Sequence, residues 1–329
     1  MHMADALISP AVGGVMLAVA AGAIGYAVGK VKQNYSEEAV PLMAVMGAFV
    51  FAAQMVNFVI PGTGSSGHIT GAILLAALLG PYAAFLALSC VLILQALFFA
   101  DGGLLALGCN IFNMAFMGCF VAYPVVFRPL IKNGHTKPRL IAAAALTCIA
   151  AAQLGAFCVV LQTLVSGVTE LPFVVFAALM QPIHFAIGAV EGVLTALVLL
   201  VVWRVEPGLF AMRANAQKIA SKTLIVFVCV ATLAVGGGVS LLASQNPDGL
   251  EWSVERVSGA PELSADGNIY AVAADLQAKS ALLPDYALPD SQNEALGTGI
   301  AGLVGAVITV IILFGLGMLA RKRKAPCRS

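Results

Sequence analysis

The chain has 329 residues, of which 60% are hydrophobic and only 10% charged, and its formal net charge is +1. Soluble proteins carry roughly 25% charged residues, so this composition excludes a soluble enzyme. The long apolar runs do not alternate as the strands of an outer-membrane barrel do, and they predict an all-α, polytopic membrane helical bundle.

Apolar runs of the length needed for membrane helices recur along the whole chain. We expect about nine transmembrane helices, or eight if the short third run is re-entrant. Neither Lys nor Arg precedes Pro10, so the start lacks the positive region of a cleavable signal and Met1 is expected to be retained. The predicted spans are 9–29, 39–60, 69–80, 83–100, 104–127, 139–165, 173–203, 223–243 and 297–320.

The basic residues predict the orientation of these spans. If the amino terminus is outside and 69–80 crosses, 15 of the 17 Lys and Arg fall on one side, as expected for the cytoplasmic side. The carboxyl terminus is then cytoplasmic too. The fifteen are Lys30, Lys32, Arg128, Lys132, Lys137, Arg139, Arg204, Arg213, Lys218, Lys222, Arg321, Lys322, Arg323, Lys324 and Arg328.

Two polar stretches divide the chain. The longest cytoplasmic connection is a linker at 205–222, which separates a first module at 1–204, with about seven spans, from a second at 223–329, with two spans. Between those two spans lies an outside loop, 244–296, whose nine acidic and two basic residues give a formal charge of −7. A solvated, translocated loop is the simplest interpretation of such a charge run.

His2 is a candidate metal ligand because it follows the amino terminus directly. The Met1 amine, the His2 amide nitrogen and the His2 imidazole can form fused chelate rings on one ion. A further nitrogen from His68 would complete a planar four-nitrogen set, which suits Ni(II) or Cu(II) better than tetrahedral zinc. The alternative is an incidental terminus. Binding requires unprotonated donors and therefore depends on pH.

Further polar groups interrupt the apolar runs. His68 closes a Gly/Pro-rich loop, 57–68, and such irregular backbone is tolerated at membrane depth only where it lines protein or a cavity; a plain surface turn is the alternative. Ionisable groups within spans usually mark a pathway or a buried hydrogen-bonded network. The supporting or pathway candidates are Asn57, Ser65, Asp101, Asn110, His184 and Glu191.

The chain contains no nucleotide-binding or hydrolase motif. It has no Walker A sequence, no HExxH and no GxSxG, and no basic nucleic-acid surface beyond the cytoplasmic loops. No catalytic residue and no organic cofactor are predicted, and any ATP hydrolysis must occur on another chain.

With its amino-terminal His2, the Gly/Pro-rich loop that ends in His68, and the polar residues within its spans, the first module resembles the CbiM/NikM family. This family comprises the metal-binding permease subunits of energy-coupling-factor cobalt and nickel transporters. The second module resembles the CbiN/NikN-type partner, and its Asp248, Gly249, Leu250 and Glu251 belong to a PDGLE signature. At 3–6 this sequence has Met-Ala-Asp-Ala where a common family opening has Ile-Pro-Asp-Gly. The matching segments are 1–10, 61–68, 101–103, 107–110, 184 and 191–192, and 247–251.

The resemblance implies that Met1, His2 and His68 bind the metal, with Ni2+ or Co2+ as the transported substrate. It implies a transmembrane coupling subunit and cytoplasmic ATPase subunits as partners, within the lipid of a bacterial inner (cytoplasmic) membrane. The predicted function is therefore the substrate-binding component of an ATP-driven nickel importer. The alternatives are a cobalt importer component serving cobalamin synthesis, a stand-alone divalent-metal secondary transporter, and a membrane enzyme that uses the metal.

Overall fold

The structure is a computed structural model that describes residues 1–34, 39–207, 221–260, 263–289 and 293–319. Nearly all regular structure in these ranges is helical. The elements are η1 (Asp5–Leu7), α1 (Pro10–Asn34), α2 (Val40–Gln54), β1 (Phe58–Ile60), β2 (Ser65–Gly67), α3 (Ala72–Leu79), α4 (Pro81–Phe98), α5 (Leu107–Asn110), the π-helix η3 (Ile111–Phe127), α6 (Arg128–Ile131), α7 (Lys137–Ser166), α8 (Phe173–Val205), α10 (Lys222–Gly237), η4 (Val239–Leu242), α11 (Gly249–Ser258), α12 (Asn268–Ser280), η5 (Pro284–Tyr286) and α13 (Glu294–Leu319).

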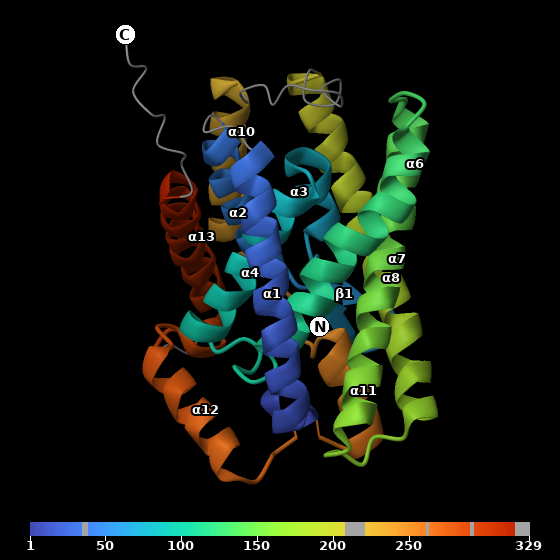
Figure 1. Cartoon of the computed structure of the whole chain (residues 1–329), viewed down its shortest axis with the longest axis vertical. Helices are drawn as coiled ribbons and strands as arrows, with labels where there is room; N and C mark the ends of the chain where they lie inside the picture. The colour runs from blue at the N-terminus through green and yellow to red at the C-terminus, as the bar shows by residue number, and fades with distance from the viewer. Residues whose placement is uncertain (35–38, 208–220, 261–262, 290–292, 320–329) are drawn as a thin grey trace.

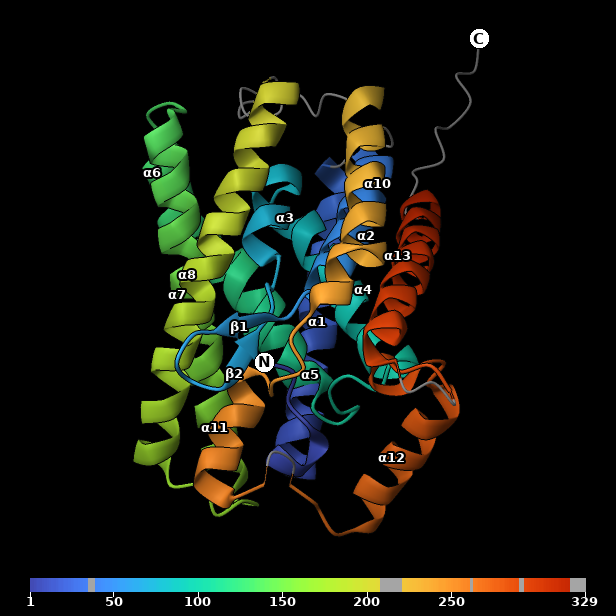
Figure 2. The ribbon, with the colours of Figure 1, turned by 180° about the vertical axis from the view of Figure 1, so that it is seen from behind.

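The long helices run side by side and form a bundle (Figure 1). On one side α7 packs along α8 and against η3, and on the other α13 packs against α2 and α10. α4 lies between the two groups, as the opposite view also shows (Figure 2), and contacts η3, α2 and α13. Its apolar sequence is the most deeply buried of the long helices, with 67% of residues inside the protein. The core therefore surrounds α4.

Two predicted spans are shorter than expected. Among the described residues seven helices are long and apolar enough to cross a membrane, whereas α2 has 15 residues and α3 only eight. At about 1.5 Å per residue, α3 extends about 12 Å and cannot cross a hydrocarbon core of about 30 Å alone. Left-handed Gly71 precedes α3, and Gly80 followed by Pro81 ends it. Nine crossings are therefore not confirmed.

The connections that carry basic residues gather at one end of the bundle. The end of α1, the turn between α6 and α7, the end of α8 and the start of α10 lie at the top of Figure 1, whereas α11 and α12 lie near the bottom. This grouping agrees with the charge pattern of the sequence. Of the predicted linker, residues 208–220 lie outside the described residues, as do the basic residues of 320–329.

The amino terminus lies inside the bundle rather than on its surface (Figure 1). Met1 is 7% exposed and Met3 is fully buried. The Met3 amide donates to Asn110 Oδ1 at 2.8 Å, and the Met3 carbonyl accepts from Asn110 Nδ2 at 3.2 Å and from the Gly103 amide at 2.9 Å. Asn110 thus pairs with the backbone of the first residues as a neighbouring strand would.

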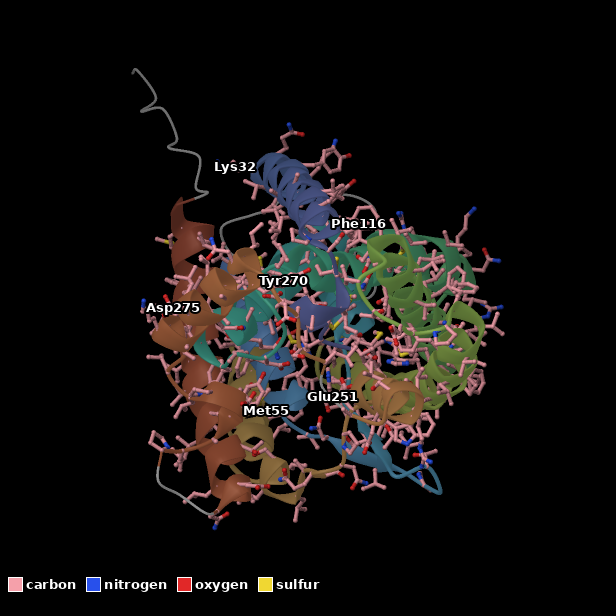
Figure 3. The ribbon with its side chains drawn as sticks, turned by 90° about the horizontal axis from the view of Figure 1, so that it is seen from below. Lys32, Met55, Phe116, Glu251, Tyr270 and Asp275 are labelled. Carbon is pink, nitrogen blue, oxygen red and sulfur yellow. The ribbon has the colours of Figure 1, made fainter. Side chains whose placement is uncertain are left out.

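The acidic loop predicted at 244–296 folds onto the bundle in its described part. α11 packs against α8, and α12 packs against α4. Viewed from below, Asp275 of α12 lies toward the edge of this end of the molecule, whereas Tyr270 of α12 and Glu251 of α11 lie nearer its centre (Figure 3). Residues of both helices line one cavity together with Ala4 and Leu7 from the first residues of the chain.

Candidate metal site

The structure brings His2 and His68 together. His2 precedes η1, and His68 directly follows β2 of the hairpin, in which Phe58 pairs with Gly67. The two imidazole rings stack with centroids 5.3 Å apart and planes 23° from parallel. The His2 side chain is only 7% exposed. Two histidines that are 66 positions apart in the sequence therefore share one buried position in the fold.

Two hydrogen-bonded glutamine side chains, Gln54 and Gln95, form an amide chain that determines which ring nitrogen of His2 is available to bind a metal ion. Gln54 Nε2 donates to the Thr70 carbonyl at 2.9 Å, so Gln54 Oε1 faces Gln95 and accepts from Gln95 Nε2 at 2.9 Å. Gln95 Oε1 must then accept from His2 Nε2, 3.1 Å away. With the proton on Nε2, the Nδ1 lone pair of neutral His2 is free. Nδ1 is the nitrogen that can close a chelate ring with the His2 amide.

His68 presents the opposite nitrogen. Its Nδ1 lies 3.0 Å from the Ile69 carbonyl, which can only accept, so Nδ1 carries the proton and Nε2 keeps its lone pair. Burial lowers the pKa of His68 to about 4, and the amino-terminal charge adds to this effect. Burial also lowers the pKa of His2. Both imidazoles are therefore neutral at neutral pH, as metal binding requires.

The Met1 amine forms an ion pair with Asp248 of the second module. Its nitrogen lies 2.6 Å from Asp248 Oδ2, and only 5% and 15% of the two side chains are exposed. Asp248 also caps α11, because its Oδ1 accepts from the amides of Leu250 and Glu251 at 2.7 and 2.9 Å. Burial opposes ionisation of Asp248, but the charge of the amine, the nearby His68 and the hydrogen bonds from the amine and the Glu251 amide together outweigh it and hold the pKa of this carboxyl well below its usual range.

Three hydrogen bonds attach the segment from Asn246 to Trp252 to the β1–β2 hairpin. The Ser66 amide donates to the Pro247 carbonyl at 2.8 Å, and Ser66 Oγ donates to the Asn246 carbonyl at 2.7 Å. The Trp252 indole donates to the Thr63 carbonyl at 3.0 Å. Pro247 and its neighbours therefore lie alongside β2, the strand that leads into His68.

Glu251 completes the capping box, because its carboxylate accepts from the Asp248 amide at 2.9 Å. Burial and the Asp248 charge raise the pKa of Glu251 to about 7. Leu250 is buried, at 2% exposure. A Cβ on Gly249 would meet the Cε1 atom of His184 at 3.1 Å. The four predicted accessory residues, Asp248 to Glu251, thus cap a helix, pair with the amine and pack on α8.

The other residues predicted to support the site lie around His2 and His68 at different distances. Ser65 Oγ donates to the Ser66 carbonyl at 3.0 Å, and the Asn57 carbonyl accepts from the Ser244 amide at 2.8 Å. Asn57 also lines a cavity of about 220 Å³ together with His2 and His68. Asn110 fixes the Met3 backbone, as described above. Ser65 and Asn110 are therefore structural neighbours of the pair.

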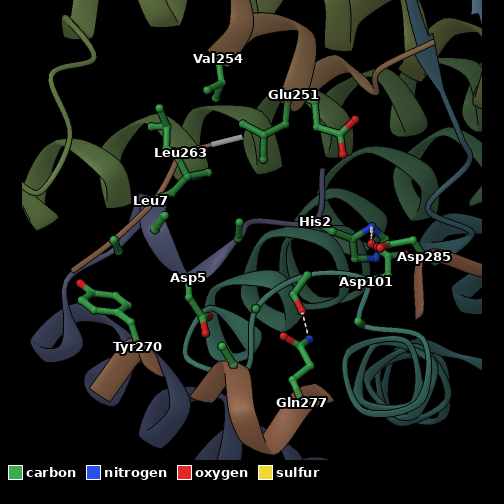
Figure 4. A pocket seen from close by; sticks show the side chains of 18 of the residues that line it. His2, Asp5, Leu7, Asp101, Glu251, Val254, Leu263, Tyr270, Gln277 and Asp285 are labelled. Carbon is green, nitrogen blue, oxygen red and sulfur yellow. Dashed lines mark hydrogen bonds and ion pairs between the residues drawn. The ribbon is translucent and has the colours of Figure 1, made fainter. Parts of the chain in front are cut away.

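Asp101 lies directly beside His2. Its Oδ1 is 3.3 Å from His2 Nδ1, and its Oδ2 accepts from the phenol of Tyr286. A larger cavity of about 560 Å³ opens next to this group, and His2, Asp101 and Asp285 lie close together at its wall (Figure 4). Asp5, Asp248, Glu251 and Asp266 also line it. Carboxylates thus surround the open approach to His2.

His184 and Glu191 lie deeper, on one face of α8. Glu191 accepts from the Thr70 hydroxyl at 2.7 Å and from the Gly71 amide at 2.9 Å, and it thereby anchors the end of the histidine loop. His184 Nδ1 lies 2.8 Å from the Met180 carbonyl, and its buried Nε2 has no hydrogen-bond partner among the described residues. Both side chains line a very small cavity, about 10 Å³, with Met1 and His68.

Two classes of residue were missed in the sequence. Gln54 and Gln95 lie in apolar runs, and a single amide there does not indicate its partner. They meet at His2 only because α2 and α4 pack side by side. Tyr286 is one aromatic residue in an acidic loop, and nothing in the loop predicts its contact with Asp101. The two glutamines could have been noticed as buried polar groups that need partners.

Side chains alone do not form a metal site in the described part of the chain. No group of three or more His, Cys, Asp or Glu side chains is arranged there to hold an ion. Two histidines with free lone pairs beside an amine and an amide nitrogen do fit the donor set expected from the sequence. The main-chain nitrogens of Met1 and His2 would have to supply half of the ligands.

Comparison with known families supports the resemblance seen in the sequence. Residues 2–209 match the family model for the cobalt uptake substrate-specific transmembrane region, CbiM. Residues 222–322 match the PDGLE domain. The fused nickel transport protein NikMN of Rhodobacter capsulatus is 31% identical and covers 98% of both chains. A NikMN chain of Archaeoglobus fulgidus is 32% identical and covers 98% of this chain and 99% of its own.

Solved structures agree with these matches. The crystal structure of a transition metal transporter is 33% identical, with a TM-score of 0.55, and covers 69% of this chain and 97% of its own. A truncated transition metal transporter is 35% identical, with a TM-score of 0.54, and covers 63% of this chain and 99% of its own. Together with its apolar helices, this likeness identifies a multi-pass membrane protein related to metal transporters. The chain therefore belongs to the CbiM family of cobalt uptake substrate-specific transmembrane regions and carries a PDGLE domain in its carboxyl-terminal part.

Proposed function

We propose that this protein is the substrate-binding component of an ATP-driven nickel importer. The observation that carries the proposal is the arrangement of His2 and His68, whose Nδ1 and Nε2 lone pairs are left free beside the Met1 amine. The ligands would be the Met1 amine, the His2 amide nitrogen, His2 Nδ1 and His68 Nε2. The amine must leave Asp248 when the ion binds.

Nickel is the preferred ion because four nitrogens in a plane suit its geometry, and because nickel binds nitrogen donors more tightly than cobalt does. Cobalt is the second candidate, since the matching family model is described as a cobalt uptake region. The ion is substrate here, and no organic cofactor is part of the proposal. An enzymatic role is less well supported, because a closed set of four nitrogens leaves little room for Lewis-acid chemistry.

In this proposal residues 1–204 form the capture module, 205–222 the cytoplasmic linker, and 223–329 the accessory module. The two family matches, at 2–209 and 222–322, support such a division. Because basic connections lie on the cytoplasmic side of membrane proteins, the bundle end formed by α6 and the start of α10 faces the cytoplasm. The site then opens to the outside, and the protein resides in the cytoplasmic membrane, with the carboxyl terminus inside.

Energy for transport comes from partner proteins in this proposal. The sequence has no nucleotide-binding motif, so cytoplasmic ATPase subunits and a transmembrane coupling subunit would drive release of the ion. Ionisable groups within the membrane-spanning helices, such as Glu191, would be needed for coupling if the chain worked alone. Glu191 is instead occupied by Thr70 and Gly71, which favours the multi-subunit importer.

The test is uptake of radioactive nickel by proteoliposomes that contain the full chain with or without its coupling and ATPase subunits. We expect uptake only when all subunits and ATP are present. Inactive ATPase subunits provide the control for leakage. Uptake by the chain alone, at the same rate with and without ATP, would replace the proposal with a secondary transporter.

Replacing Gln95 with leucine tests how the amide chain orients His2. Leucine keeps the approximate shape but removes both hydrogen bonds, so the ring loses the partner that directs Nδ1 toward the ion. Loss of such a supporting contact typically weakens metal binding about 10- to 100-fold. We expect a weakening of this size for nickel, measured by calorimetry on the purified chain.

Gln153→Leu is the matched control, because Gln153 is a partly buried glutamine whose Nε2 donates to the Gln181 carbonyl at 2.7 Å, a hydrogen bond that involves neither His2 nor His68. We expect its nickel affinity to match that of the wild type. Equal affinities for the Gln95 and Gln153 variants would show that the amide chain has no influence on His2.

A further inference from the structure

Two hydrogen-bond acceptors face each other at His2. Nδ1 carries a lone pair when Nε2 donates to Gln95, and the carboxylate of Asp101 approaches this same nitrogen at 3.3 Å. Figure 4 shows Asp101 beside the His2 ring. A lone pair and a carboxylate at this separation repel each other unless a cation or proton lies between them. The geometry therefore places a negative charge next to the nitrogen that would bind the ion.

The other oxygen of Asp101 is already engaged. Tyr286 donates its phenol hydrogen to Oδ2, and a hydrogen bond to an ionised acceptor is short and strong. Burial and the nearby Asp101 charge hold the pKa of Tyr286 well above its usual range, so the phenol remains a donor. Asp101 is thus held by the second module on one side and faces His2 on the other.

The backbone around Tyr286 is fixed to the end of α4. The amides of Leu282 and Leu283 donate to the Phe98 carbonyl at 2.8 and 3.1 Å, and the Asp285 amide donates to the Phe99 carbonyl at 2.8 Å. The Tyr286 ring stacks on Phe99, with centroids 5.1 Å apart.

Within this docked turn, Asp285 and Tyr286 have φ of 50° and 59°. Non-glycine residues rarely adopt this left-handed conformation, and it persists only where the surroundings enforce it. The hydrogen bonds to Phe98 and Phe99 enforce it here. They place the Tyr286 phenol against Asp101 at the cost of local strain.

We propose that Tyr286 is a positioning residue that sets the metal preference of the site by holding Asp101 back from the ion. The inference rests on the proposed function. Held by the phenol, Asp101 balances the charge of the bound ion without becoming a ligand, and the four nitrogens remain the only donors. Released, the carboxylate adds an oxygen ligand and raises the coordination number. Planar coordination favours nickel, whereas an added oxygen ligand is tolerated better by cobalt and zinc.

The test compares Tyr286→Phe with wild type in the full chain, purified in detergent. Affinities for Ni(II) and Co(II) are measured by calorimetry, and the visible absorption of the nickel complex reports its coordination. Phenylalanine keeps the stacking on Phe99. We expect the ratio of cobalt to nickel affinity to rise at least about tenfold, or about 1.4 kcal/mol, and the absorption of planar nickel to give way to that of a higher-coordinate ion.

Tyr270→Phe is the matched control. Tyr270 belongs to the same outside segment, but its phenol donates to the Ile8 carbonyl at 2.9 Å rather than to Asp101, from which it lies apart in Figure 4. We expect this variant to keep the wild-type affinity ratio and nickel spectrum. In the background of Asp101→Asn, Tyr286→Phe should no longer change the ratio, because the residue through which it acts is neutral.

The outcomes separate this inference from the proposed function. Equal weakening of both metals by Tyr286→Phe, or an unchanged ratio and spectrum, would overturn the inference and leave Tyr286 as a docking residue. Absence of any nickel or cobalt binding by the wild-type chain would instead overturn the proposed function itself.

Discussion

Replacing either His2 or His68 with alanine should weaken nickel binding at least about 100-fold, equivalent to about 2.7 kcal/mol. Each substitution removes one of two neutral imidazole donors, and no third metal-binding side chain is arranged with them in the described residues. Calorimetric titration of the purified chain with Ni(II) is the measurement. If both histidines are donors to one ion, each single substitution weakens binding, and the double variant binds at least as weakly as the weaker single variant.

His135→Ala is the control for this comparison. His135 lies in the turn between α6 and α7, at the opposite end of the bundle from α11. We expect its nickel titration to match the wild type. Stoichiometric binding in both the His2 and His68 variants would rule out the amino-terminal chelate. Attention would then turn to Asp101, His184 and Glu191.

Adding residues before Met1 should abolish nickel binding even though every side chain remains. An extension converts the amine into a peptide amide, which removes a ligand and breaks the 2.6 Å ion pair with Asp248. It also has little room, because Met1 is 7% exposed inside the bundle. The experiment compares a Gly-Ser extension with a protease-cleaved version of the same chain that begins at Met1. We expect calorimetry to detect binding only after cleavage.

The same Gly-Ser sequence attached at the carboxyl terminus controls for effects of the tag on folding. Thermal unfolding of each version shows whether the extended chain remains folded. A folded, extended chain that binds nickel as tightly as the cleaved one would contradict participation of the amine.

The sequence was sufficient for much of the fold. The seven long apolar helices among the described residues all correspond to predicted spans, and the gathering of basic connections agrees with the charge pattern. The lengths of α2 and α3 do not follow from the sequence pattern. The run predicted at 39–60 is helical only over Val40–Gln54, and the run predicted at 69–80 only over Ala72–Leu79, between Gly71 and Gly80, which both have positive φ. An apolar run therefore predicts a buried segment more securely than a membrane crossing.

For the metal site, the sequence predicts the candidate ligands but not the side chains that orient them. His2 and His68 could be paired from the sequence, because the amine, amide and imidazole at the amino terminus make three donors of one chelate and the histidine that closes the Gly/Pro-rich loop could supply the fourth. The partners that orient them could not. Gln54 and Gln95 act through hydrogen bonds between helices, and Tyr286 acts from a segment nearly two hundred positions after Asp101. Such contacts depend on tertiary packing, which no local pattern encodes.

The ion pair between Met1 and Asp248 has a consequence for biosynthesis. The two residues are 247 positions apart, so the first residue finds its partner only after α10 has been made and α11 has folded. Contacts of such long range form late, because the intervening loop must close first. Fusion of both modules in one chain raises the effective concentration of Asp248 at the amine. The contact between Met1 and Asp248 is therefore one of the last in the protein to form during synthesis, and each chain carries both of its partners.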